Sequence, residues 1–222
     1  MKIFITSGGC KVPIDDVRHI GNFSSGRYGA ELGDLFVKSE KEVIFFHEKH
    51  SKFPAYLYLN DNGEVNPVLI PYKDYYEYLK VKDLIRQEQP DIIISAAAVS
   101  DYVVDKTEGK ISSKHDTLTI KLKKGEKVLK SFRDLAPHAY IVGFKLLVDP
   151  TEVEINTAVD KVFDSGVNAV VYNNLSDLRN GITERRLYYS RDRGKRGYTI
   201  CDAETLVEEI LVESSLFKIF KT

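Results

Sequence analysis

Four short runs of continuous apolar residues, each bounded by glycine, proline or polar residues, constrain the fold of this chain most strongly. They are KIFITSGG from residue 2, PDIIISAAAVSDY from residue 90, AYIVGFKL from residue 139 and NAVVYNN from residue 168. Runs without polar alternation are typical of parallel strands that are buried on both faces. A similar run, KEVIFFHEK from residue 41, predicts a further strand, and a short strand is expected at 67–70.

Helical patterns separate these runs. After residue 25, GRYGAELGDLFVKSE places Leu32, Leu35 and Phe36 on one helical face, with Ser24 or Ser25 available as the N-cap. The segment 74–89 repeats apolar residues at helical spacing and predicts a surface helix.

Two more helices are predicted in the second half of the chain. In the segment 149–166, Thr151 and Glu154 form a capping box and Gly166 stops the helix. The segment 203–220 forms the closing helix.

The alternation of strands and helices predicts an α/β fold: a doubly wound, mostly parallel Rossmann-like sheet with helices on both faces. We expect one domain over residues 1–222, because no composition shift marks a boundary. The alternating segment 117–124 predicts an antiparallel strand, and a hairpin is expected around Gly194. The segments 115–124 and 183–200 would then form a small antiparallel appendage. Ligands of such sheets bind at the carboxyl ends of the strands.

Composition excludes several classes of protein. The net charge of −1 and the pI near 6.5 argue against a nucleic-acid surface, and the basic cluster 184–197 is interpreted as a solvated hairpin. Cys10 and Cys201 form no disulfide framework, and the five histidines lack ligand spacing, so no metal site is expected. With no leader segment and no apolar run near 18 residues, we expect a cytoplasmic protein without a membrane or nucleic-acid partner.

The segment 17–33, VRHIGNFSSGRYGAELG, places hydroxyl groups and backbone N–H groups at the start of a helix, where an anion is favoured. A serine N-cap beside packing glycines is an alternative interpretation. A dinucleotide-binding loop is a third, although the fingerprint GxGxxG is absent.

Other strand ends carry further candidate residues. The alanines of SAAAVSDY admit a flat ring against the backbone, and Asp101 can accept hydrogen bonds from a ribose or a base. Lys110, in the glycine-containing segment EGKISSKH, suits a polyphosphate as a point charge. Phe144 stacks on a base in one interpretation and belongs to the core in the other.

Four ordered motifs resemble those of the phosphopantothenate–cysteine ligase family. They are TSGGCKVPIDDVRHIGNFSSGRYGA, ISAAAVSDY, GKISS and IVGFKLLVDPTE, and the resemblance covers essentially the whole chain. NFSSGRYGA and the later SKFP look closer to the free-standing eukaryotic-type enzyme. The flavin-dependent decarboxylase that precedes this domain in the common bacterial form has no counterpart here, so decarboxylation is not expected.

The resemblance implies a ligase reaction in two steps for coenzyme A biosynthesis. The carboxylate of 4′-phosphopantothenate attacks the α-phosphate of ATP or CTP, giving an acyl-nucleotide and pyrophosphate. The amine of L-cysteine then displaces the nucleoside monophosphate. Mg²⁺ is expected to bridge the phosphates.

The resemblance also implies a role for each matching residue. Asn22 stabilises charge as cysteine attacks, and Lys110 neutralises the triphosphate. The phosphate end of the pantothenate is held by Ser24, Ser25, Gly26, Arg27 and Gly29. The nucleotide is held by Gly8, Gly9, Ala96, Ala97, Asp101, Lys110, Phe144 and Lys161.

Several expectations remain open from the sequence. The family forms its sites at a dimer interface, so a homodimer with the appendage as its arm is implied, and the loop 102–116 is a candidate lid. Cys10 stands where the family usually has threonine, and it is either a reactive thiol or a small buried residue. Ser165 stands where bacterial relatives often have a second lysine. The alternatives to a ligase are an NAD(P)-type reductase, for which Tyr78 and Lys82 give a YxxxK spacing, and a non-catalytic nucleotide-binding module.

Overall fold

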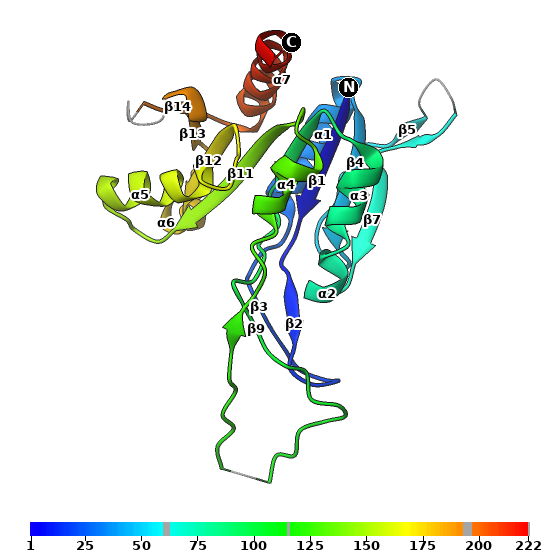
Figure 1. Cartoon of the computed structure of the whole chain (residues 1–222), viewed down its shortest axis with the longest axis vertical. Helices are drawn as coiled ribbons and strands as arrows, with labels where there is room; N and C mark the ends of the chain where they lie inside the picture. Colours follow the sequence, from blue (N-terminus) through cyan, green and yellow to red (C-terminus); the bar gives the residue numbers. More distant parts are fainter. Residues whose placement is uncertain (60–62, 115, 193–196, 222) are drawn as a thin grey trace.

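The computed structural model describes residues 1–59, 63–114, 116–192 and 197–221, and it is built around one central sheet (Figure 1). The strands of this sheet are β1 (Lys2–Ser7), β4 (Glu42–Glu48), β7 (Val68–Tyr72), β8 (Ile92–Ser95), β11 (Tyr140–Leu147), β12 (Ala169–Asn174), β13 (Arg185–Tyr189) and β14 (Thr199–Cys201). Their spatial order is β14-β13-β12-β11-β8-β1-β4-β7. Neighbours from β12 to β7 pair in parallel, and β13 and β14 pair antiparallel. The doubly wound, mostly parallel sheet predicted from the apolar runs is confirmed.

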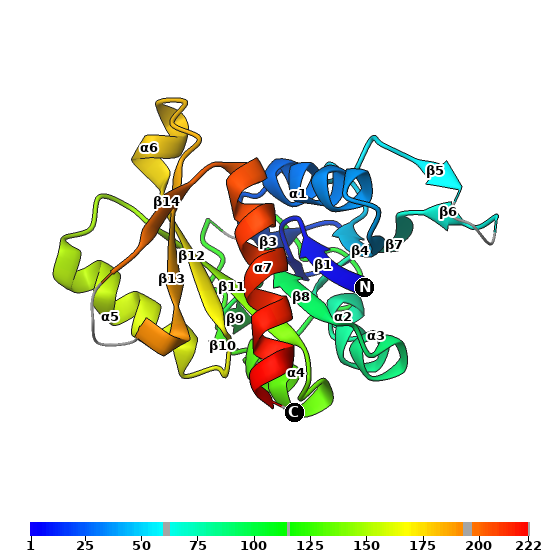
Figure 2. The same cartoon turned by 90° about the horizontal axis from the view of Figure 1, so that it is seen from above.

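The helices cover both faces of the sheet (Figure 2). They are α1 (Arg27–Lys38), α2 (Tyr75–Tyr78), α3 (Val81–Glu88), α4 (Leu129–Leu135), α5 (Glu152–Phe163), α6 (Leu175–Arg179) and α7 (Ala203–Lys221), with a short 3₁₀ helix at Ser190–Asp192. Helices α1 and α7 pack on one face, and α2 to α5 pack on the other. None of the described helices has both the length and the apolar content that crossing a bilayer requires.

Strand alternation sorts the core into two layers. Ile3 and Ile5 pack under α1 and α7, whereas Phe4 between them packs under the helices of the opposite face. Successive side chains of a strand point to opposite faces, so a strand that is apolar at every position is buried on both. Leu32 and Phe36 of α1 are fully buried, as their helical spacing predicts.

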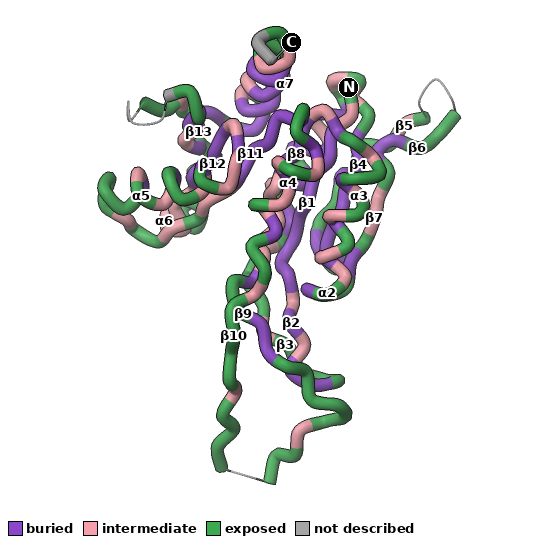
Figure 3. The backbone as a smooth tube through the Cα atoms, in the orientation of Figure 1, coloured by how far each residue is buried: buried purple, intermediate pink, exposed green. Residues whose placement is uncertain are grey.

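Three small antiparallel pairs stand beside the central sheet. They are β2 (Lys11–Pro13) with β3 (His19–Gly21), β5 (Tyr58–Leu59) with β6 (Val65–Asn66), and β9 (Tyr102–Val103) with β10 (Lys123–Lys124). The segments around β2, β3, β9 and β10 extend away from the sheet, and the outermost part of this extension is mostly exposed (Figure 3).

Four local expectations need correction. The N-cap of α1 is Gly26, with φ of 73°, rather than either serine, although the Oγ of Ser25 accepts a hydrogen bond from the N–H of Arg27 at 3.4 Å. The segment 74–89 forms two short helices, α2 and α3, rather than one. Only Lys123–Lys124 of the predicted strand 117–124 is a strand, because the preceding residues have no neighbouring strand to pair with.

The fourth correction concerns the basic cluster 184–197. An antiparallel hairpin is present as β13 and β14, although its turn around Gly194 lies outside the described residues. The hairpin extends the central sheet, and its first strand is buried at Arg185, Leu187, Tyr188 and Tyr189 rather than solvated. Pairing with β12 places this strand over the core beneath α7. The capping box of Thr151 and Glu154, in contrast, is confirmed at the start of α5.

Candidate functional site

A cleft of about 1750 Å³ follows the carboxyl ends of the parallel strands. It is lined by the turn before α1, by the residues after β8, by the end of β11, and by parts of α4 and α5. The end of β12, the start of the antiparallel strand β13 and the start of α7 complete its wall. This is the edge of a doubly wound sheet at which ligands bind.

The turn before α1 presents unsatisfied backbone groups to the cleft. Gly26 adopts a left-handed conformation and has no side chain to cap the helix. The N–H of Arg27 donates a long hydrogen bond of 3.4 Å to the Oγ of Ser25, so the next N–H groups of the first turn are the ones available to a ligand. Gly29 allows the helix to approach β1 closely: a Cβ atom there would lie 2.3 Å from the Oγ of Ser7. The arrangement suits an anion at the positive end of the helix dipole.

Asn22 is fixed against the end of β8. Its Nδ2 donates hydrogen bonds to the carbonyl oxygens of Ala98 and Val99, both at 3.2 Å. A backbone bridge between Gly9 and Ala98 joins the two segments. The amide of Asn22 therefore sits at the junction of two segments: the turn after β1 that contains Gly8 and Gly9, which we call the glycine turn, and the alanine-rich tip of β8.

Charged and aromatic groups complete the cleft. Asp101 is paired with Lys127 at 2.5 Å, and Lys161 reaches the cleft from α5. Phe144 is half-buried and meets the ring of Tyr28 edge-on, with the ring centres 6.1 Å apart. The cleft thus offers cations, an aromatic wall and small residues along one edge.

Most of the predicted site residues line this cleft. They are Asn22, Ser24, Ser25, Gly26, Arg27, Gly29, Ala96, Ala97, Asp101, Phe144 and Lys161.

Gly8 and Gly9 do not line the cleft, and packing explains both glycines. Gly8 has φ of 91°, and a Cβ atom there would lie 2.8 Å from the Cβ of Glu48. A Cβ atom on Gly9 would lie 2.5 Å from the carbonyl oxygen of Asn22. Their small size keeps the turn close to its neighbours.

Lys110 also lies outside the cleft of its own chain. Both of its neighbours are anchored: the N–H of Gly109 donates to Asp16 at 2.9 Å, and the N–H of Ile111 donates to Asp15 at 3.1 Å. Arg18 donates to the carbonyl oxygen of Ile111 at 2.5 Å. The base of the extension therefore fixes the backbone on each side of Lys110.

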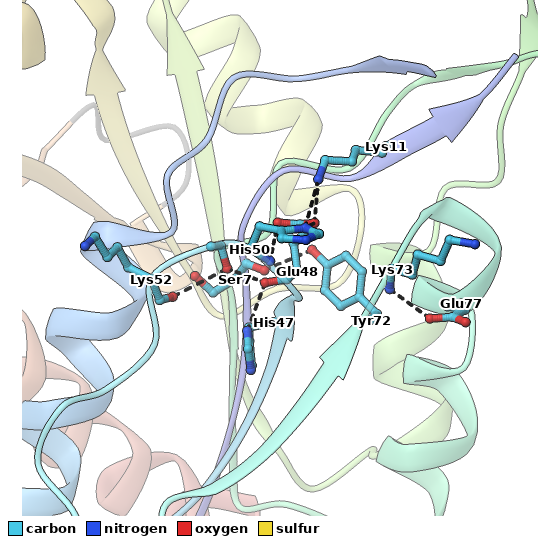
Figure 4. A network of polar contacts seen from close by, with 10 residues as sticks. Ser7, Lys11, His47, Glu48, His50, Lys52, Tyr72, Lys73 and Glu77 are labelled. Atoms are coloured by element: carbon cyan, nitrogen blue, oxygen red, sulfur yellow. Dashed lines mark hydrogen bonds and ion pairs between the residues drawn. The ribbon is translucent and has the colours of Figure 1, made fainter. Parts of the chain in front are cut away.

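A polar network braces the other side of the glycine turn (Figure 4). The carboxylate of Glu48, almost fully buried, accepts a hydrogen bond from Lys11 at 2.6 Å and contacts the ring of His50 at 3.1 Å. Burial opposes the ionisation of Glu48, but these hydrogen bonds outweigh it and lower the pKa of the carboxyl group. The network joins β2 to the end of β4, beside the turn that carries Asn22.

Cys10 is a small buried residue rather than a reactive thiol. It is fully buried, and burial raises the pKa of the thiol to about 12. A thiol with this pKa is protonated near neutral pH and is a poor nucleophile.

The residue pair suggested for a reductase is not assembled. Tyr78 lies at the end of α2, fully buried against the sheet, while Lys82 belongs to α3 and is paired with Glu126 at 2.8 Å. A fully buried Tyr78 and an ion-paired Lys82 do not form the pair on which that alternative depended.

Among the cleft residues that the sequence reasoning did not assign to the site are Tyr28, Asn173 and Arg185. Asn173 follows Tyr172, whose strand end was expected to face a ligand, so its position gave a usable signal. Arg185 had none, because its burial depends on how β13 joins the sheet.

The fold and the cleft define a class: a doubly wound α/β protein with a large cleft at the carboxyl edge of its sheet. The chain belongs to the family of the DNA/pantothenate metabolism flavoprotein C-terminal domain, which it matches over residues 1–187. The family resemblance of its motifs is confirmed.

Named relatives agree with this assignment. The chain is 33% identical over 180 residues to the coenzyme A biosynthesis bifunctional protein CoaBC of Methanocaldococcus jannaschii, covering 79% of this chain and 41% of that protein. It is 31% identical over 219 residues to phosphopantothenate–cysteine ligase 1 of Arabidopsis thaliana, covering 78% of this chain and 69% of that protein. The chain thus spans less than half of the archaeal relative and about two thirds of the plant one.

A solved structure shares the fold. A Cab2 variant in complex with phosphopantothenate-cysteine superimposes with a TM-score of 0.81 at 22% identity, covering 99% of this chain and 88% of that one.

Proposed function

We propose that this protein is a phosphopantothenate–cysteine ligase of coenzyme A biosynthesis. The observation that carries the proposal is the family match combined with the cleft, which gathers the anion-binding turn, the alanine-rich strand tip and Asn22. The family implies a nucleotide-dependent reaction with phosphopantothenate and L-cysteine as small-molecule substrates. We infer that the nucleotide is ATP or CTP and that the reaction takes place in the cytoplasm.

In the first step, a carboxylate oxygen of 4′-phosphopantothenate forms a bond to the α-phosphorus, and the bond to the departing pyrophosphate breaks. We assign the phosphate end of the pantothenate to Ser24, Ser25, Gly26, Arg27 and Gly29, because free N–H groups and a helix dipole meet there.

The nucleotide lies across the strand ends in this proposal. Ala96 and Ala97 give it room, and Phe144 packs against it. Asp101 and Lys161 provide polar contacts. Gly8 and Gly9 keep only the packing role described above.

In the second step, the amine of cysteine forms a bond to the acyl carbon, the nucleoside monophosphate leaves with the bonding electron pair, and the amine loses a proton to solvent. Asn22 stabilises the charge that develops on the acyl group. Its anchoring to Ala98 and Val99 holds the side chain in place before cysteine arrives.

Mg²⁺ would enter on the phosphates of the nucleotide. No cluster of three or more His, Cys, Asp or Glu side chains suited to a metal occurs in the described parts of the chain. This fits Mg²⁺, which keeps several waters and is held by substrate phosphates with one or two carboxylates. Asp101 is one of the carboxylates of the cleft that would contribute, and the ion would neutralise phosphate charge.

Lys110 supports a homodimer. It lies outside the cleft of its own chain, at a backbone position that Asp15 and Asp16 anchor. We infer that the extension carries Lys110 to the cleft of a second copy, where its charge acts on the triphosphate.

The decisive experiment is a reconstitution. Purified protein is incubated with 4′-phosphopantothenate, L-cysteine, Mg²⁺ and either ATP or CTP, and both pyrophosphate and phosphopantothenoylcysteine are measured. We expect stoichiometric formation of both products with at least one nucleotide. If no pyrophosphate formed with ATP or with CTP, the ligase proposal would be refuted. Nucleotide binding without turnover would favour a non-catalytic module.

A further inference from the structure

One corner of the cleft contains buried polar atoms without partners. The Oη of Tyr28, the Oδ1 of Asn173 and the Nε of Arg185 are buried and have no hydrogen-bond partner in the described part of the chain. All three residues line the cleft. A buried polar atom without a partner costs about 1–3 kcal/mol, so atoms of this kind gathered in a cleft indicate a ligand that satisfies them.

The strand register brings these residues to one side of the sheet. Val171 and Leu187 belong to the core beneath α1 and α7, and alternation places Asn173 and Arg185 on that same face. Tyr28 approaches from the first turn of α1, and the guanidinium carbon of Arg185 lies 4.9 Å from the centre of its ring. With Phe144, which also packs on this face, these three residues form what we call the Arg185 corner.

Arg185 is a fixed donor. It is only 9% exposed, and its Nη1 donates to the carbonyl oxygens of Ile182 at 3.1 Å and Glu184 at 2.9 Å. No ion pair joins it to a carboxylate of the described residues. The neighbouring Arg186 differs, because it is paired with Glu152 at 2.8 Å and does not line the cleft.

The corner therefore offers a donor, an acceptor and an aromatic surface. The N–H of Arg185 requires an acceptor on the ligand, the oxygen of Asn173 requires a donor, and Tyr28 and Phe144 favour a flat ring. Adenine and cytosine carry a ring nitrogen acceptor beside an amino donor. Guanine and uracil carry an N–H donor beside a carbonyl acceptor at the corresponding edge.

We propose that Arg185 determines base specificity: the Arg185 corner binds the base of the nucleoside triphosphate and selects adenine or cytosine over guanine and uracil. This rests on the proposed function for the presence of a triphosphate in the cleft. With the same edge toward the corner, guanine or uracil would place a donor against the N–H of Arg185 and an acceptor against the oxygen of Asn173, and this mismatch is the basis of the rejection.

The test measures equilibrium binding by calorimetry, without phosphopantothenate or cysteine. The ligands are the α,β-methylene analogues of ATP, CTP, GTP and UTP with Mg²⁺. We expect at least one of the ATP and CTP analogues to bind about 10- to 100-fold more tightly than the GTP and UTP analogues, as a charge-assisted hydrogen bond allows. Arg185→Met should abolish this ratio, whereas the control Arg186→Met should keep it.

A second substitution covers the case in which Arg185→Met does not fold, because Arg185 also holds two backbone carbonyls. Arg185→Lys keeps the charge but places no Nε–H at the same point, and its thermal unfolding reports whether the fold is intact. It should also lose the base preference.

Three results would overturn the proposal. The first is a wild-type protein that shows no base preference or binds none of the four analogues. The second is a folded Arg185 variant that keeps the preference, and the third is an Arg185 variant that loses affinity equally for all four analogues. The last result would make Arg185 a phosphate contact. The ligase proposal is tested separately, because base selection without product formation refutes only the ligase function, and product formation without base selection refutes only the role of Arg185.

Discussion

Replacement of Asn22 by aspartate should separate the two half-reactions. The side chain of Asn22 donates two hydrogen bonds of 3.2 Å to backbone carbonyl oxygens at the tip of β8. An aspartate cannot donate these bonds, and its charge would face the same oxygens. Asn22 is exposed, so each lost bond costs about 0.5–1 kcal/mol, and the two together account for at most about a 30-fold effect.

The catalytic role predicts a larger and selective loss. Removing one group that stabilises developing charge typically slows the step about 10²- to 10³-fold. With Asn22→Asp we therefore expect amide formation to fall by about this factor, while a first turnover still releases pyrophosphate at nearly the wild-type rate. The acyl-nucleotide should then accumulate.

Rapid-quench measurements of pyrophosphate and of the acyl-nucleotide, with and without cysteine, test this expectation. Asn180→Asp, at an exposed position outside the cleft, is the matched control and should behave as wild type. If pyrophosphate release and amide formation fell by the same factor, Asn22 would be an anchor of the turn and not a group that acts on cysteine attack.

The remaining predictions test the dimer, the polar network and the close approach of α1 to β1. Random mixing of Lys110→Gln with Asn22→Asp chains should restore about one quarter of wild-type activity. Half of the dimers would then be mixed, and each mixed dimer would contain one intact site of two. Activity no higher than that of the separate variants would show that Lys110 does not act across an interface. Glu48→Gln should lower the free energy of unfolding by about 1–2 kcal/mol at pH 7. Because the fold lowers the pKa of Glu48, the stabilisation by its carboxylate is complete above the unfolded pKa of about 4.3 and is lost as the pH falls through the folded pKa. The free energies of unfolding of wild type and Glu48→Gln, measured by denaturant titration, should therefore converge in acid. A difference that does not depend on pH would contradict this assignment. Gly29→Ala should destabilise the fold by roughly 1–3 kcal/mol in thermal unfolding, because the added Cβ would lie 2.3 Å from the Oγ of Ser7. The control Gly197→Ala, where a Cβ meets nothing within 4 Å, should not destabilise it. Equal effects of the two substitutions would refute the close approach of α1 to β1.

The sequence by itself determined the parallel sheet and most of its edge. Runs such as Ile92–Ile94 are apolar at every position, and only burial on both faces accommodates them, so the layer order followed without tertiary information. Because the carboxyl ends of parallel strands meet at one edge, the residues after β1, β8 and β11 could be expected to share a cleft. The capping box of α5 was equally readable, because its two side chains lie three residues apart.

Only the tertiary structure decided what depends on contacts between distant segments. Gly8 looked like a ligand-binding glycine, but its neighbour is Glu48, 40 residues away in the chain. Lys110 matched a nucleotide-binding motif, yet its anchors in the segment 15–18 hold it outside the cleft of its own chain. Arg185 is charged and lies in a basic, tyrosine-rich segment, and no local pattern predicts its burial. Pairing of β13 with β12 and the packing of α1 against that strand remove it from water, and these contacts turn an apparent surface arginine into a wall of the cleft.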